Sequence, residues 1–221
     1  MKIEAKILDH MGFDMRVADA ARVSFAKKAE GFTDEQNHKL IRYLSKEGHI
    51  APFGHNYLLF HVKAPIFVSN QLVKHKFMRM SQISRRYIST DPEFYVPDEW
   101  RASADSVKQG SGGKAQSQFF PTQYLLQTNE EATQRYRKML SQGICAEQAR
   151  MHLPLNTFTE WWWSGSLDAF SDMANLRLKS DTQYETRLVA QQISDAVRPL
   201  FPVAWDALLN PDQMAALRKG V

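Results

Sequence analysis

Cysteine is almost absent from this chain of 221 residues, since Cys145 is the only one. A single thiol excludes a disulfide within the chain and any metal site built from several cysteines. The sequence also lacks a run of about 18 apolar residues, which argues against a membrane-spanning helix. The charged start, from Met1 to Lys6, lacks the apolar stretch of a secretory signal. A cytoplasmic protein that does not enter a membrane is therefore expected.

Neither sign of charge dominates the composition. The formal net charge is +4 and the sequence pI is about 9.1. This small excess suits an anionic partner but does not choose between nucleotides, phosphates and nucleic acid. Hydrophobic residues are 43% and charged residues 24% of the chain, as in soluble globular proteins. With no internal repeat and no shift in composition, residues 1–221 are expected to form one domain.

Local patterns predict the class α+β, with a small, mainly antiparallel sheet flanked by helices and a helical C-terminal half. Thr33 and Gln36 form a capping box that opens a helix ending near Gly48. The remaining expectations are helices at 14–25 and 66–76, a strand at 57–64, extended segments at 81–89 and 94–96, a flexible loop at 103–118, and mostly helix from 122 onward.

Polar side chains that could bind a ligand are most concentrated between Gln71 and Tyr87. Spacing of three and four residues would put Gln71, Lys74 and His75 on one face of the helix expected there. Alternation in the following segment would put Gln82, Ser84 and Arg86 on one face of a strand, with Arg85 on the other. An amide, an ammonium, a hydroxyl and a guanidinium are the donors that a phosphate monoester needs.

Acidic residues are missing from this same stretch. Five positive charges occur within thirteen residues, at Lys74, Lys76, Arg79, Arg85 and Arg86. Like charges repel one another unless an anion balances them, so the pattern favours a bound anion. The alternative is an ordinary solvated basic face, because lysine and arginine are mostly exposed in folded proteins.

Other candidates each have an ordinary structural explanation. Arg150 has Glu147 three residues before it and Arg177 has Asp181 four residues after it, so each arginine could form a surface ion pair on a helix. Cys145 is expected to be a buried structural thiol inside a helix. The histidines at 49, 55 and 61 recur every six residues, a spacing that matches no helix face and no common zinc pattern.

A series of segments resembles the flavin-dependent thymidylate synthases. They are 48–55 (Gly-His-Ile-Ala-Pro-Phe-Gly-His), 60–68 (Phe-His-Val-Lys-Ala-Pro-Ile-Phe-Val), Glu93 to Pro97, Ala149-Arg150, Leu153 to Asn156, and Asn175 to Arg177. The family signature is Arg-His-Arg, seven residues, Ser, one residue and Arg. It corresponds here to Lys74-His75-Lys76, seven residues, Ser84, Arg85 and Arg86. The resemblance covers nearly the whole chain in the same order.

The resemblance implies a homotetramer with active sites shared between subunits, and FAD bound without a dinucleotide fingerprint. The sequence indeed lacks Gly-x-Gly-x-x-Gly. It further implies reductive methylation of dUMP to dTMP, with methylenetetrahydrofolate as carbon donor and NADPH as reductant, and no nucleic-acid partner. Ordinary thymidylate synthases use a cysteine nucleophile, whereas Cys145 has no basic neighbour in sequence to activate it.

Position by position, the resemblance assigns two sets of residues. Arg177 would act on the pyrimidine ring as the catalytic residue, because a fixed guanidinium stabilises negative charge developing there. Contacts to dUMP would come from Gln71, Lys74, Gln82, Ser84, Arg85, Arg86, Arg150 and Arg177. Contacts to FAD would come from Ser24, His49, Ala51, Lys74, His75, Lys76, Gln82, Ser166 and Asp172.

The sequence departs from the family pattern at several of these positions. Lysine replaces both arginines of the triplet, which removes two planar bidentate donors. Gln82 replaces a common glutamate. Ser166, Asp168, Asp172 and Asp181 replace the usual Asn, Arg, Asn and His near the flavin. Two alternatives therefore stay open: a flavin- and folate-dependent hydroxymethylase acting on dUMP or dCMP, and a nucleotide-binding relative without catalytic activity.

Overall fold

A four-stranded antiparallel sheet organises the protein. The computed structural model describes residues 2–104 and 110–209. Its strands are β1 (Glu4–Met11), β2 (Tyr57–Pro65), β3 (Met78–Gln82) and β4 (Phe158–Ser166). They lie in the order β1-β2-β4-β3, and each neighbouring pair is antiparallel. The expected α+β class with a small antiparallel sheet is confirmed.

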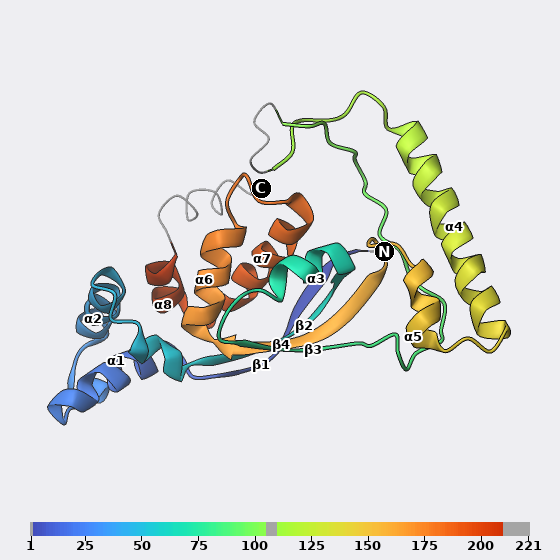
Figure 1. The fold of residues 1–221 in the computed structure, drawn as a ribbon. Coiled ribbons are helices and arrows are strands. Elements are labelled where there is room, and N and C mark those ends of the chain that lie inside the picture. Colours follow the sequence, from blue (N-terminus) through green and yellow to red (C-terminus); the bar gives the residue numbers. More distant parts are fainter. Residues whose placement is uncertain (1, 105–109, 210–221) are drawn as a thin grey trace.

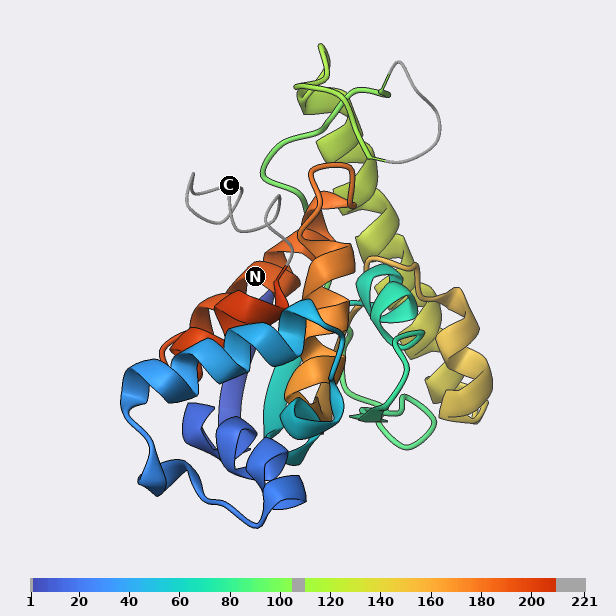
Figure 2. The ribbon, with the colours of Figure 1, turned by 90° about the vertical axis from the view of Figure 1, so that its left-hand side faces the viewer.

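Helices surround this sheet unevenly (Figure 1). They are α1 (Asp14–Arg22), α2 (Asp34–Lys46), α3 (Ile66–Leu72), α4 (Phe119–Ser141), α5 (Ala146–Ala149), α6 (Leu167–Arg177), α7 (Tyr184–Val197) and α8 (Pro202–Leu208). Short 3-10 turns are η1 (Val23–Phe25), η2 (Ala29–Gly31), η3 (Ala51–His55) and η4 (Arg150–His152). Helices α3, α6 and α7 cover one face of the sheet, whereas α4 stands apart from it beside α5 (Figures 1 and 2). No helix in these two described ranges is long and apolar enough to cross a membrane.

The second half, expected to be mostly helical, also contributes the unpredicted strand β4 to the sheet. Along it, Trp161 and Trp163 are 1% exposed, whereas Trp162 between them is 56% exposed. That alternation is the period of a strand, and aromatic residues favour strands. Trp163 packs edge-on against Phe170 of α6, which also contacts Phe60 of β2. The central strand thus builds the core between sheet and helices. Strand β1 was also not predicted.

The capping box is confirmed. The Gln36 amide donates to the Thr33 hydroxyl oxygen at 3.3 Å, and the Thr33 amide donates to Gln36 Oε1 at 2.9 Å. Helix α2 then runs to Lys46, and Gly48 follows in the left-handed region with φ 71°. A glycine reaches that region without steric cost, which explains the helix end.

The segment after α3 differs from the prediction. The helix ends at Leu72, not Lys76, because the chain must reverse there to pair β3 with β4. Phe77 makes this reversal with φ 63° and is 82% exposed. Beyond β3 the chain turns again, with the Tyr87 amide donating to the Ser84 carbonyl. The expected helix face through Gln71, Lys74 and His75 and the strand face through Gln82, Ser84 and Arg86 are therefore both wrong.

Two further expectations concern the second half. Cys145 is exposed and caps the short helix α5, so the prediction of a buried thiol inside a helix is wrong. Residues 110–118 connect to α4 without regular structure apart from a bridge between Arg101 and Lys114. The loop expected at 103–118 fits these residues, and its positions 105–109 lie outside the described residues.

Two glycines at positive φ provide a matched test of close packing. A Cβ on Gly12 (φ 97°) would lie 1.9 Å from Oδ1 of Asn56, a fully buried side chain, whereas a Cβ on Gly48 would meet nothing within 4 Å. We expect Gly48→Ala to lower the free energy of unfolding by about 1 kcal/mol through backbone strain alone. Gly12→Ala should lower the free energy of unfolding by about 1–3 kcal/mol more than Gly48→Ala, because its Cβ would clash with Asn56. Urea unfolding measures both, and equal losses would contradict this packing.

Candidate functional site

Most of the site residues that the sequence analysis proposed fall into three separate groups in the folded chain. One group lines a cavity between β3, β4 and η4, a second lies where α3 and α6 end, and a third lines a cavity between α1, α2 and η3. We call them the Arg85 cavity, the Arg177 cluster and the His49 cavity.

The Arg85 cavity, of about 520 Å³, brings together four of the residues nominated for dUMP. They are Gln82, Ser84, Arg85 and Arg150. Gln82 ends β3 and the other three follow from the turn after β3 and from η4. Apolar side chains such as Ile66, Leu153 and Phe158 form part of the wall. A concave site with a few converging polar groups is the usual form of a small-molecule site.

The two arginines of the Arg85 cavity donate their hydrogen bonds to backbone carbonyls. Arg85 donates to the carbonyls of Thr90 and Asp91 at 2.9 and 3.4 Å. Arg150 donates through Nε to the Glu147 carbonyl at 3.2 Å. These acceptors are neutral backbone groups. The Glu147 carboxylate lies 3.6 Å from Arg86 instead, so the expected Glu147–Arg150 side-chain pair is wrong.

Three carboxylates, those of Asp91, Glu93 and Glu160, also line this cavity, and each is paired with a cation. Asp91 accepts two hydrogen bonds from Arg137, and this guanidinium holds the pKa of the Asp91 carboxyl below its usual range. Glu93 and Glu160 lie 2.6 and 3.4 Å from the Lys63 ammonium. Because these acids are already paired, the two arginines of the cavity are available to an incoming anion.

Gln82 presents only an acceptor to the cavity. Its Nε2 donates to Thr159 Oγ1 at 2.9 Å and to Ser69 Oγ at 3.3 Å. An amide nitrogen carries two hydrogens, so both are used. The remaining Oε1 can accept a hydrogen bond from a ligand hydroxyl, as one oxygen of a glutamate would, but without the negative charge.

The Arg177 cluster consists of Gln71, His75 and Arg177. Arg177 Nε donates to His75 Nε2 at 3.0 Å, and its Nη2 donates to the Gln71 carbonyl at 3.1 Å. The expected surface pair of Arg177 with Asp181 is therefore wrong. Pro65 pairs with Phe158 and Tyr57 with Ser166, so α3 and α6 begin at opposite ends of one strand pair. They run over the same face, and their C-terminal ends meet at this cluster.

Burial sets the protonation of the cluster. Burial, together with the positive charge of Arg177, lowers the pKa of His75 to about 4. The imidazole is therefore neutral near pH 7, and Nε2 can accept the hydrogen bond from Arg177. Burial also lowers the pKa of Arg177, but an arginine stays charged at any ordinary pH.

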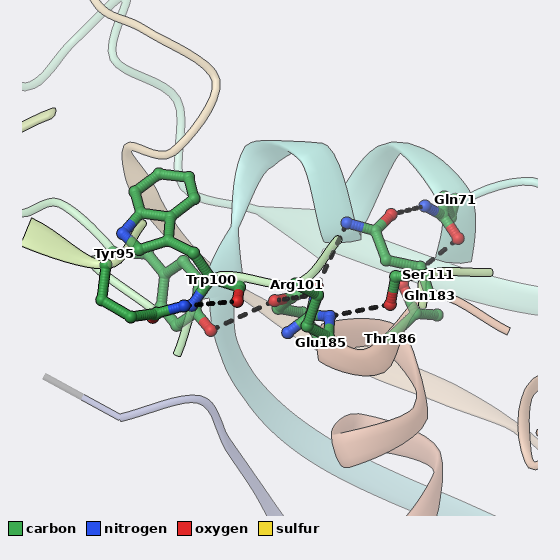
Figure 3. A network of polar contacts seen from close by, with 9 residues as sticks. Gln71, Tyr95, Trp100, Arg101, Ser111, Gln183, Glu185 and Thr186 are labelled. Atoms are coloured by element: carbon green, nitrogen blue, oxygen red, sulfur yellow. Dashed lines mark hydrogen bonds and ion pairs between the residues drawn. The ribbon is translucent and has the colours of Figure 1, made fainter. Parts of the chain in front are cut away.

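A buried polar network extends from this cluster to the segment before α4 (Figure 3). The Gln71 amide donates to Gln183, and Thr186 donates to Gln71 Oε1 at 3.2 Å. Gln183 donates to Glu185 at 3.2 Å, and Arg101 donates to the same carboxylate at 2.7 Å. Glu185 is 3% exposed. Sequence reasoning missed Arg101, Gln183 and Glu185, because no spacing pattern connects them to Gln71.

Tyr95 completes this network, since its hydroxyl donates to Glu185 at 3.3 Å. Burial and the neighbouring Glu185 carboxylate raise the pKa of Tyr95 above its usual range. The hydroxyl therefore keeps its proton and acts as a donor. Three donors thus converge on the one buried carboxylate, which satisfies a charge that would otherwise be costly to bury.

The His49 cavity, of about 870 Å³, holds three of the residues nominated for the flavin: Ser24, His49 and Ala51. Aromatic side chains Phe25 and Tyr43 share its wall. Arg22 also lines it; the residue is 8% exposed and its guanidinium lies 3.8 Å from the Phe32 ring centroid. The cavity therefore offers flat stacking surfaces and one positive charge.

The remaining nominated residues lie outside both cavities. Lys74 and Lys76 are exposed between α3 and β3, and Arg86 is exposed over the ring of Tyr87. Ser166 caps α6, which carries Asp172. Burial and the nearby Asp168 raise the pKa of the Asp172 carboxyl. Among the described residues, no group of three or more His, Cys, Asp or Glu side chains is placed to hold a metal ion.

Comparisons with known proteins place these features in a family. Residues 6–203 match the family model described as thymidylate synthase complementing protein. A flavin-dependent thymidylate synthase of Thermus thermophilus is 37% identical over 202 residues, which cover 91% of this chain and 74% of that protein. The one from Kosmotoga olearia is 34% identical over 207 residues, covering 93% and 89%.

The fold has close counterparts among solved structures. The UMP/dUMP methylase PolB of Streptomyces cacaoi, bound with 5-Br dUMP, superposes with a TM-score of 0.86 and 31% identity over 93% of this chain and 94% of that one. Its structure with 5-Br UMP gives 0.84 and 28% identity over 95% and 97%. The chain belongs to the flavin-dependent thymidylate synthase family.

The neutral His75 makes the stability of the protein depend on pH. Its pKa is about 4 in the folded state and 6.5 ordinarily. A depressed pKa stabilises the fold fully above pH 6.5, and that contribution is lost as the pH falls towards 4. We expect the midpoint of thermal unfolding to fall more steeply between pH 6.5 and 4 for the wild type than for His75→Phe. Parallel slopes in calorimetry would show that His75 is not buried in its neutral form.

Proposed function

We propose that this protein methylates dUMP reductively to dTMP, using methylenetetrahydrofolate, FAD and NADPH. The observation that carries the proposal is the Arg85 cavity, where Arg85 and Arg150 donate only to neutral carbonyls while the neighbouring acids are paired elsewhere. A nucleotide phosphate is an anion that two arginines and the Ser84 hydroxyl can bind together. Family membership and the likeness to a UMP/dUMP methylase support the same substrate class.

Gln82 would then recognise the sugar. Its free Oε1 accepts a hydrogen bond from a sugar hydroxyl, because its amide hydrogens are held by Thr159 and Ser69. A ribose offers one more hydroxyl than a deoxyribose. UMP is therefore the informative competitor for dUMP at this cavity.

The His49 cavity would hold the flavin. Its volume and its aromatic walls suit a flat ring system, and Arg22 contributes a positive charge. Asp168 and Asp172 are not among the residues that line it, so they do not oppose the cofactor's diphosphate from the cavity wall. When bound and reduced, FAD supplies the hydride of the reaction.

Arg177 would act on the pyrimidine ring. Its guanidinium is held at two points, so it can face charge that develops on the ring without first having to reorient. Cys145 does not line the Arg85 cavity, which argues against a cysteine nucleophile. A single thiol also suits a reducing compartment, and we propose a cytoplasmic location.

We further propose that the complete active site forms between copies of the chain in a homotetramer. Arg177, His75 and Gln71 do not line either cavity, although the proposed reaction needs them beside the nucleotide. Exposed aromatic residues support association, including Phe77, Tyr87, Phe119, Phe120 and Tyr124, each more than 60% exposed. Large exposed apolar groups are typical of surfaces that bind another protein.

The decisive experiment is an anaerobic incubation of flavin-loaded protein with methylenetetrahydrofolate, NADPH and one of dUMP, UMP or dCMP, with products resolved by mass. Flavin-dependent gain of a methyl group on dUMP is the expected result. Gain of a hydroxymethyl group, or reaction of dCMP alone, would support the hydroxymethylase instead. Protein that binds dUMP but forms no product under any condition would support a nucleotide-binding relative.

Two inactive variants test whether sites are shared. We expect Arg150→Ala and Arg177→Ala each to lower kcat/KM at least about a hundredfold, because each removes a charged contact to the substrate. Mixed and reassembled, they should recover about a quarter of the wild-type activity, since random association restores both arginines in that fraction of shared sites. Arg135→Ala, which removes a surface arginine paired with Glu131, is the control. If each variant is inactive and mixing restores no activity, one chain supplies both arginines to a site.

A further inference from the structure

We infer that His75 is a positioning residue for Arg177, acting as the hydrogen-bond acceptor that fixes the guanidinium toward the pyrimidine ring. This inference rests on the proposed function, because it concerns how Arg177 is aimed. The family resemblance places His75 near the flavin, and the structure adds a contact from this histidine to the arginine on the nucleotide side.

The geometry of the guanidinium carries the argument. Arg177 has three nitrogens that can donate, and two of them are committed: Nε to His75 at 3.0 Å and Nη2 to the Gln71 carbonyl at 3.1 Å. No hydrogen bond from Nη1 occurs within the part of the chain that the structure describes. Because the two anchors lie on one edge of the planar group, they leave the opposite corner to a ligand.

Each anchor is itself held in place. The His75 ring lies 6.5 Å from the ring of Trp163, which is 1% exposed in the core. Gln71 belongs to the last turn of α3, and its side chain is bonded to both Gln183 and Thr186. Gln71 thus belongs to the network of Figure 3 through its side chain and contacts Arg177 through its carbonyl, while His75 contacts both Arg177 and Trp163 of the core. A guanidinium held at two points loses little further freedom when substrate binds.

The state of the imidazole matters for this role. Only a neutral ring has a nitrogen lone pair that can accept from Arg177, and a protonated ring would present a donor to a donor. Desolvation and the charge of Arg177 keep His75 neutral near pH 7. The flanking Lys74 and Lys76 are exposed and add no acid that would favour protonation.

The test compares His75→Phe with His75→Gln in the flavin-loaded protein. Phenylalanine keeps a ring beside Trp163 but has no acceptor, whereas the glutamine carbonyl can restore one. The probe is 5-bromo-dUMP, and the readout is the N3 pKa of the bound nucleotide, followed by ultraviolet difference titration. We expect the wild type to lower this pKa below that of the free nucleotide, His75→Phe to return it toward the free value, and His75→Gln to lower it again.

Turnover should follow the same order. His75→Phe should lower kcat about tenfold to a hundredfold with little change in KM, because a misdirected group acts mainly on the transition state. Combining it with Arg177→Lys should add no further loss, since both changes act through one guanidinium. Flavin affinity is measured in parallel by fluorescence titration, so that each variant is compared at equal flavin occupancy.

Failure of the inference differs from failure of the proposed function. If dTMP forms and Arg177→Ala abolishes it, but His75→Phe leaves the N3 pKa and kcat unchanged, the positioning role is wrong. If His75→Phe instead weakens flavin binding and leaves the N3 pKa unchanged, His75 is a flavin contact. A wild type that forms no dTMP and does not shift the N3 pKa would remove both proposals together.

Discussion

The pairing of β2 with β4 is the interaction on which the rest of the molecule depends. β4 is the only link between β3 and the other strands in the described sheet. Its buried Trp163 packs against Phe170 of α6 and lies beside His75, which follows α3. Because the two strands are antiparallel, the helices that follow them start at opposite ends and their last turns meet. The contact between His75 and Arg177 is a result of that arrangement.

Charge pairing explains how the Arg85 cavity can offer two arginines to a ligand although three carboxylates share its wall. These acids are bound to Lys63 and Arg137, which are not among the residues that line the cavity. Arg85 and Arg150 are left with backbone acceptors only. The sequence concentrates positive charge between Lys74 and Arg86, and folding then decides which of those charges face the cavity.

The sequence predicted correctly those elements whose formation depends on residues close together in the chain. The capping box at Thr33, strand β2 and the end of helix α2 before Gly48 follow from residues within a few positions of each other. The end of α3 could not be predicted from spacing, because it is set by β3 pairing with β4, which lies far away in the chain. The same limit hid Glu185, whose burial depends on Arg101 and Tyr95 from another segment. Family resemblance proposed both Arg177 and His75 as site residues, but the hydrogen bond between them became visible only in three dimensions.

Phe77 carries a consequence for engineering and selection. An aromatic residue in the left-handed region costs about 1–2 kcal/mol, and its side chain, at 82% exposure, recovers almost nothing by burial in the single chain. It lies two residues after His75, at the reversal that brings this histidine to Arg177. Glycine at this position would remove the backbone strain and stabilise the single chain. The same change would make the reversal that places His75 against Arg177 more flexible. A variant selected for thermostability at position 77 is therefore expected to lose catalytic activity.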